Sequence, residues 1–154
     1  IIYNEFFEYQ SETWDILSYI NRLFRENGLT HYLAYGTLLG AIRDRGANTW
    51  DYDEDIHIKY QIEIRLLQIL KTNLSENYYY VYTDIMPNYP AECLRICKKG
   101  YTYMSIHVDV FFLVGCPETK EKRVPLLKLA RKWSNLEFKN MHINIQMVIS
   151  VAQK

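Results

Sequence analysis

The chain has 154 residues, of which 49% are hydrophobic and 15% aromatic, and its 18 basic side chains balance its 18 Asp and Glu side chains. This length suits a single compact domain over residues 1–154, and the apolar content excludes a disordered chain. Because the formal net charge is zero, the composition also argues against nucleic acid as a partner.

The arrangement of residues excludes two further classes. No stretch is apolar over the roughly 18 residues that a transmembrane helix requires, so no membrane-spanning segment is predicted in this chain. The three cysteines, Cys93, Cys97 and Cys116, are odd in number and lack the paired spacing of a structural zinc site. Free thiols are the simpler interpretation.

Periodicity predicts the first helix and the first strand. Apolar side chains recur at helical spacing from Ser11 onward, and Gly28 stands where a left-handed C-terminal cap is needed. Residues 30–35 are aromatic and begin with a β-branched residue, which is typical of a buried strand.

A glycine turn and a short helix are predicted to follow this strand. Gly36 allows a tight exit, and Thr37 is expected to cap a helix that runs through Arg43. The N–H groups and dipole at a helix N-terminus favour a phosphate, to which the Thr37 hydroxyl can also bond. Arg43 and Arg45 can neutralise further phosphate oxygens. The turn therefore predicts a phosphate-binding site.

Four acidic residues crowd the next segment: Asp51, Asp53, Glu54 and Asp55. Polar and apolar side chains alternate over residues 53–59, which predicts a strand with Asp53 and Asp55 on one face. Carboxylates about 4 Å apart repel by roughly 4 kcal/mol at an effective dielectric constant of about 20, so a cation is expected between them. Oxygen ligands of this kind suit Mg²⁺ or Mn²⁺.

The remaining segments predict a mixed α/β (α+β) domain in which helices flank a small mixed or mostly antiparallel sheet. The tyrosines of residues 78–82 are interpreted as core, and the basic face of residues 118–137 as solvated surface. The expected elements are a helix over 62–74, strands over 78–83, 93–99 and 105–115, an amphipathic helix over 118–137 and a strand over 141–151.

Asp109 interrupts the strongly β-prone run of residues 105–115. An unpaired carboxylate at mid-strand is costly, so Asp109 needs a partner. If its strand neighbours residues 53–59, Asp109 meets Asp53 and Asp55. A glycine turn feeding such a group of acids is typical of metal-assisted phosphoryl or nucleotidyl transfer.

Two histidines accompany these acids. His57 and His107 each lie one same-face step from a predicted ligand aspartate, and either can bind the metal or a donor phosphate. A place beside the ligands or in solvent is the commoner role for such an imidazole.

The segment "HYLAYGTLLGAIRDRGANTWDYDEDIHI" resembles the signature of the LicD family, which includes bacterial phosphocholine transferases and the eukaryotic fukutin and fukutin-related proteins. The similarity extends from the helix near Leu17 through "HVDVFFLVGCP" to Lys122, roughly two thirds of the chain. The resemblance implies a nucleotidyltransferase-like fold.

The resemblance further implies a metal-dependent transferase that moves a phospho-alcohol group, such as phosphocholine or ribitol phosphate, from a CDP-linked donor to a glycan or glycoconjugate acceptor. The resemblance also implies that an Mg²⁺ or Mn²⁺ ion would bind the donor phosphates and that Asp109 would orient or deprotonate the acceptor hydroxyl. The implied compartment is the secretory lumen for a fukutin-like protein, and the cytoplasm or the membrane surface for a bacterial one. The implied residues are Asp53, Asp55 and Asp109 for catalysis and metal binding, Asp51 as an outer metal ligand, and Gly36, Thr37 and Arg43 for the donor phosphates.

Two alternatives stay open. The same layout can transfer a nucleotide to a small molecule or sugar. The chain can also be a catalytically degenerate binding module, because "ANT" precedes Trp50 where the family has an aromatic-Ile-Pro sequence, and because the C-terminal part is expected to be incomplete.

Overall fold

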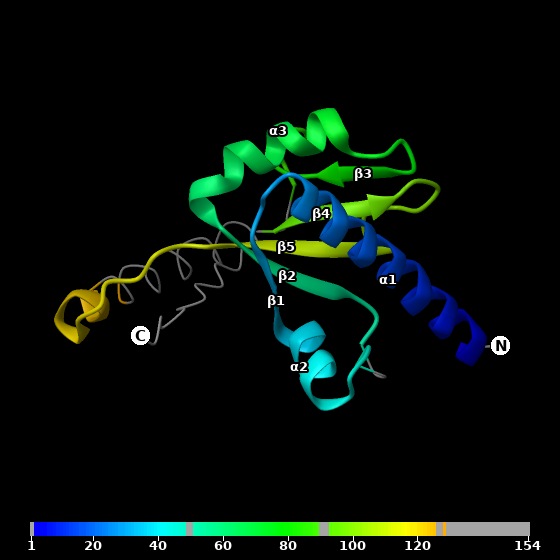
Figure 1. Ribbon diagram of the computed structural model, residues 1–154, viewed down its shortest axis with the longest axis horizontal. Coiled ribbons are helices and arrows are strands. Elements are labelled where there is room, and N and C mark those ends of the chain that lie inside the picture. Colours follow the sequence, from blue (N-terminus) through cyan, green and yellow to red (C-terminus); the bar gives the residue numbers. More distant parts are fainter. Residues whose placement is uncertain (1, 49–50, 90–92, 126–127, 129–154) are drawn as a thin grey trace.

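The computed structural model describes residues 2–48, 51–89, 93–125 and 128. A helix of 25 residues opens the chain, and five short strands follow it (Figure 1). In chain order the elements are α1 (Ile2–Glu26), β1 (His31–Leu33), α2 (Tyr35–Arg43), β2 (Glu54–Lys59), the 3-10 helix η1 (Tyr60–Ile62), α3 (Glu63–Asn73), β3 (Tyr78–Val81), β4 (Leu94–Lys98) and β5 (His107–Leu113).

The five strands form one mixed sheet in the order β1-β2-β5-β4-β3. Strands β2 and β5 run parallel at its centre, and the other neighbours are antiparallel. A parallel pair needs a long crossover, which here contains α3, β3 and β4. The predicted fold class is confirmed, and the strand of Asp109 does pair with residues 54–59, the condition under which Asp109 meets the acids of β2.

The two faces of the sheet have different roles. Helices α1 and α3 cover one face, and Figure 1 shows α2 beyond the β1 edge of the sheet, at the opposite edge from α3. Because side chains alternate along a strand, every second residue of β2, β4 and β5 points into this core and the others point to the opposite face. The fully buried core includes Ile16, Ile20, Phe24, Ile56, Ile58, Leu66, Leu94, Ile96, Val108 and Val110.

Several element boundaries differ from the sequence prediction. Helix α1 begins at Ile2 rather than near Ser11. The prediction that Thr37 caps α2 is wrong, because the N-cap residue is Ala34 and makes no side-chain cap bond. None of the described helices is both long and apolar enough to cross a bilayer.

The C-terminal predictions fall largely outside the described residues. Residues 120–125 are helical, in agreement with the start of the predicted helix over 118–137. The rest of that helix and the strand over 141–151 lie outside the described part. A single domain over residues 1–154 stays a prediction.

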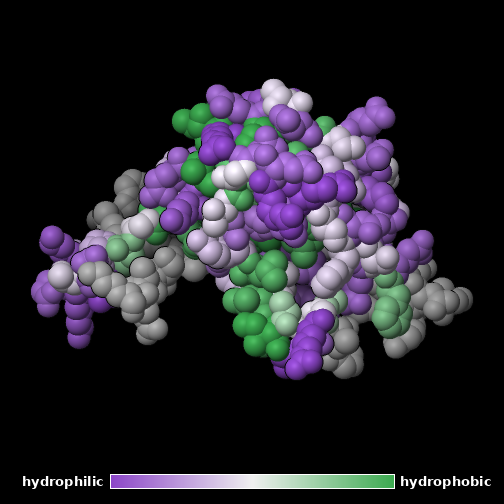
Figure 2. Space-filling view, viewed as in Figure 1, coloured by the Kyte–Doolittle hydropathy of each residue, from purple (hydrophilic) through white to green (hydrophobic). Residues whose placement is uncertain are grey.

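Helix α2 is held by few of its own side chains. Thr37 and Gly40 are its buried residues. Leu38, Leu39 and Ile42 are exposed, and Figure 2 shows apolar side chains gathered over this part of the surface. The fit of Gly40 against the following loop is therefore important for the position of the helix.

Replacing Gly40 by alanine is expected to destabilise the protein by about 1–2 kcal/mol. A Cβ there would lie 2.6 Å from the backbone nitrogen of Asn48 and 2.7 Å from the carbonyl oxygen of Gly46. Backbone cannot move aside as a flexible side chain can, so this overlap outweighs the gain of about 1 kcal/mol in helix propensity. Urea unfolding measures the effect.

Gly46→Ala is the matched control, because no atom lies within 4 Å of a Cβ built at Gly46. Its free energy of unfolding is expected to change by less than about 0.5 kcal/mol. Equal stability of the two variants would contradict the packing described for Gly40.

Candidate functional site

The acidic site lies where the two parallel strands begin. Asp53 directly precedes β2, Asp55 is its second residue, and Asp55 stands opposite Asp109 of β5 in the strand register. These carboxylates point to the sheet face away from α1 and α3. Glu54 points the other way and is buried, so the four acids that crowd the sequence are divided between the two faces.

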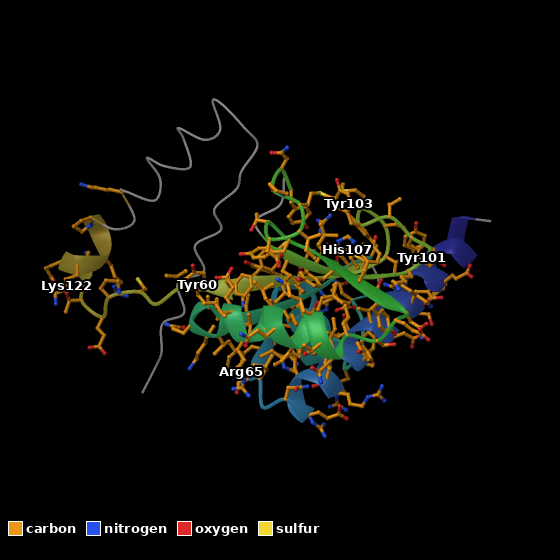
Figure 3. The ribbon with its side chains drawn as sticks, turned by 90° about the horizontal axis from the view of Figure 1, so that it is seen from above. Tyr60, Arg65, Tyr101, Tyr103, His107 and Lys122 are labelled. Carbon is orange, nitrogen blue, oxygen red and sulfur yellow. The ribbon has the colours of Figure 1, made fainter. Side chains whose placement is uncertain are left out.

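Three potential ligands meet at this point. One side-chain atom each of Asp53, His107 and Asp109 lie within 4.8 Å of one another. Figure 3 shows His107 and the nearby Tyr103 on the side of the strands away from α3. Asp55 is adjacent but does not belong to this group, and the sequence analysis had placed His107 outside the ligand set.

His107 is oriented as a metal ligand would be. Its Nδ1 lies 2.8 Å from the carbonyl oxygen of Ser105, and a proton on Nδ1 donates to that oxygen. The other nitrogen, Nε2, then carries a lone pair and lies 3.6 Å from Oδ1 of Asp109. Burial lowers the pKa of His107, which favours this neutral form.

Arg95 is the site residue that the sequence analysis missed. It stands opposite Asp109 in the β4–β5 register. Its Nε donates to Oδ1 of Asp109 at 2.8 Å, its Nη2 to Oδ2 at 3.3 Å, and its Nη1 to the Tyr103 carbonyl at 3.2 Å. Burial disfavours the charged guanidinium, but attraction to Asp109 outweighs burial and leaves the pKa of Arg95 raised. Asp109 therefore has a fixed counter-ion within the protein.

The other two acids of this face carry unfavourable charge. Burial, followed by repulsion from Asp53 and Asp109, raises the pKa of Asp55 to about 7. Burial and the neighbouring Asp53 raise the pKa of Asp51 to about 6. A divalent ion relieves such repulsion, so the electrostatics of this face fit a cation.

The pKa of Asp55 predicts a pH-dependent cost in metal-free protein. With an ordinary pKa of 3.8, the unfolded chain loses this proton before the folded protein does, so the folded state loses stability as pH rises from about 4 to about 7. Relative to Asp55→Asn, the wild type should lose about 2 kcal/mol over this range, after discounting for partial exposure. Urea unfolding in EDTA at several pH values measures the difference.

The comparison with Asp55→Asn separates Asp55 from the histidines. Burial lowers the pKa values of His31, His57 and His107, which stabilises the protein as pH rises and acts in the opposite direction. The free energy of unfolding of the wild type minus that of Asp55→Asn should fall as pH rises. If this difference does not change with pH, or rises, Asp55 is not buried among like charges.

The start of α2 borders the same site. The backbone N–H of Asp55 donates to the Thr37 hydroxyl at 2.7 Å, so Thr37 connects α2 to β2. A Cβ at Gly36 would overlap the Asp51 carboxylate, so a larger residue here would displace the Asp51 side chain. Asp51 therefore lies against the helix start where a phosphate is predicted, and phosphate binding by Gly36 and Thr37 stays a prediction.

Arg43 lies at the other end of α2. Its guanidinium is exposed and donates to Asp44 at 2.8 and 2.6 Å and to the side-chain oxygen of Asn48 at 3.3 Å. The structure does not bring Arg43 to the carboxylates of β2 and β5. Its predicted contact with the donor phosphates stays a prediction, as does that of Arg45.

Comparisons with known proteins give the chain its family. The LicD/FKTN/FKRP nucleotidyltransferase domain matches residues 28–144. The chain is 28% identical over 133 residues to the lipopolysaccharide cholinephosphotransferase LicD of Haemophilus influenzae, which covers 81% of this chain and 50% of that protein. It is 37% identical over 57 residues to the uncharacterized protein RP689 of Rickettsia prowazekii, covering 37% of this chain and 21% of that protein.

The chain thus spans about half the length of its Haemophilus relative. The domain match covers more than half of the chain and includes both strands of the site, α2 and Arg95. The chain belongs to the LicD/FKTN/FKRP family.

Proposed function

We propose that the chain is the catalytic part of a metal-dependent transferase that moves a phospho-alcohol group from a CDP-linked donor to a glycan acceptor. The family and the similarity to a lipopolysaccharide cholinephosphotransferase support this class of reaction. The observation that carries the proposal is the convergence of Asp53, His107 and Asp109 on one face of the sheet. Phosphocholine and ribitol phosphate are the proposed types of transferred group.

The proposed cofactor is Mn²⁺ or Mg²⁺, held by Asp53, Asp109 and His107, with Asp55 beside it and Asp51 further out. Two carboxylates suit both ions, whereas an imidazole ligand suits Mn²⁺ better than Mg²⁺. When bound, the ion would neutralise negative charge on the donor diphosphate and on the departing cytidine monophosphate. We therefore expect activity at lower concentrations of Mn²⁺ than of Mg²⁺.

The protein's own side chains are proposed to orient the reactants and to take up the proton. Arg95 donates to both carboxylate oxygens of Asp109 and so fixes the orientation of that side chain, for which we propose a role in metal binding. Asp55 is the register partner of Asp109 and points to the same face of the sheet. We therefore propose that Asp55 is the general base that accepts the proton of the acceptor hydroxyl. Gly36 and Thr37 are proposed to lie against the donor phosphates once Asp51 has moved from the start of α2, with Arg43 nearby.

A donor screen tests the proposal. The protein is incubated with CDP-choline or CDP-ribitol, a glycan acceptor and Mn²⁺ or Mg²⁺, and cytidine monophosphate is measured. Metal-dependent release that ceases with EDTA is the expected result. Release of pyrophosphate from a nucleoside triphosphate would instead indicate nucleotidyl transfer, and binding of the donor without turnover would indicate a degenerate module.

A further inference from the structure

A groove of about 760 Å³ lies on the same face of the sheet as the acidic site. Its lining side chains come from three strands and the turns after them. In the register Tyr32 stands opposite His57, and Lys59 stands opposite Leu113, so these residues share the face of Asp55 and Asp109. The groove is lined by Tyr32, His57, Lys59, Gln61, Leu113, Val114 and Gly115.

The groove lies further along β2 and β5 than the acidic site, on the same face of the sheet. Lys59 lies four residues beyond Asp55 on β2, a distance of about 13 Å at the rise of a strand. His57 and Phe111 stand one same-face step beyond Asp55 and Asp109, and the Tyr35 ring lies edge-on to them, with its centroid 5.1 Å and 5.3 Å from theirs. A ligand with one end at the carboxylates can therefore extend over His57 into the groove.

The groove walls offer both a flat apolar surface and hydrogen-bonding groups. Tyr32 is 48% exposed, and its ring offers an apolar face for stacking. The Nε2 atom of His57 is buried and has no hydrogen-bond partner among the described residues, which is costly unless a ligand supplies one. Gln61 adds a carboxamide, with a donor and an acceptor.

We propose that this groove binds the base of the nucleotide donor, an assignment that rests on the function proposed above. An aromatic face with hydrogen-bonding groups at its edge recognises a planar heterocycle, because every base can stack and presents donors and acceptors at its rim. The diphosphate lies at the carboxylates, and the base lies over Tyr32 and His57.

The positive charge of Lys59 disfavours the choline end of a choline-type donor in the groove. Lys59 is the charged side chain of the described lining, and no acidic side chain belongs to that lining. A quaternary ammonium needs aromatic faces or carboxylates around it and is repelled by an ammonium group. The transferred alcohol therefore extends from the metal site away from Lys59.

Isothermal titration of the protein with cytidine monophosphate in the presence of Mn²⁺ tests this assignment. Tyr32→Ala, which removes the stacking ring, and His57→Phe, which keeps the ring but removes Nε2, should each weaken binding by about tenfold. Tyr60→Ala is the matched control, because Tyr60 is 51% exposed and does not line the groove. It should bind as the wild type does.

Phosphocholine is titrated in parallel, and its affinity should be unchanged in Tyr32→Ala and His57→Phe. If both variants bind cytidine monophosphate as tightly as the wild type, or if they lose phosphocholine instead, the assignment of the groove is wrong while the proposed function stands. If the folded wild type binds no cytidine monophosphate with Mn²⁺, both proposals are overturned.

Discussion

Asp53→Asn and Asp109→Asn are each expected to lower metal-dependent turnover by about 10³-fold, the largest effect on activity predicted for this chain. Each change removes one of the two carboxylates that meet at His107, and a neutral amide holds a divalent ion weakly. The release of cytidine monophosphate from the donor at saturating Mn²⁺ measures the loss.

Asp15→Asn is the control for these variants, because Asp15 is exposed on α1, on the core side of the sheet. It should retain full activity. Titration of each variant with Mn²⁺ shows whether it still binds the ion. This separates a variant that has lost the ion from one that binds it but has lost turnover. If Asp53→Asn or Asp109→Asn keeps more than a tenth of the wild-type rate, that carboxylate is no essential ligand.

Arg95→Leu is expected to destabilise the metal-free protein by about 3–5 kcal/mol, because it leaves a buried carboxylate without its counter-ion. Only 8% of the Asp109 side chain and 16% of that of Arg95 are exposed, so water replaces the lost ion pair poorly. Added Mn²⁺ should reduce the destabilisation, since a bound cation compensates the same charge. Urea unfolding with and without Mn²⁺ gives both values.

The double variant Arg95→Leu/Asp109→Leu controls for packing at this position. It should recover much of the lost stability, because no charge remains buried, while turnover stays abolished. If the free energy of unfolding of Arg95→Leu is within about 1 kcal/mol of the wild-type value, the Asp109 carboxylate does not need Arg95 as its counter-ion. The ion pair would then have no structural role.

Local patterns in the sequence were sufficient to predict the two strands that carry the acidic residues of the candidate site. Period two over residues 53–59 placed Asp53 and Asp55 on one face, and the β-prone run around Asp109 predicted its strand; both strands are observed. The need of Asp109 for a partner was also apparent. Which partner it has depends on the register between distant strands, which local periodicity does not contain.

Arg95 shows this limit most clearly. It interrupts the apolar strand β4 just as Asp109 interrupts β5, so the same signal was present in both segments. Pairing them required the antiparallel register that places the two side by side. His107 shared the face of Asp109 by period two, which left metal binding open for it, and the Ser105 carbonyl that orients its ring is visible only in the folded structure.

Tertiary contacts also overrode two local predictions. Threonine is a common helix cap, yet the Thr37 hydroxyl accepts a hydrogen bond from the backbone N–H of Asp55 and so connects α2 to β2. Helix α1 extends back to Ile2, through a segment that the sequence analysis had left out of the helix, and Gln10 within it donates to the carbonyl oxygens of Asn48 and Asp51. Both departures lie next to contacts with other elements, which a pattern within one segment cannot represent.

A crystal structure of the protein with Mn²⁺, measured at the manganese absorption edge, is the most direct test of the site. We expect one strong anomalous peak within bonding distance of carboxylate oxygens of Asp53 and Asp109 and of Nε2 of His107. A Mn²⁺ peak elsewhere on the chain, with these three side chains unchanged and Arg95 alone at Asp109, would contradict it.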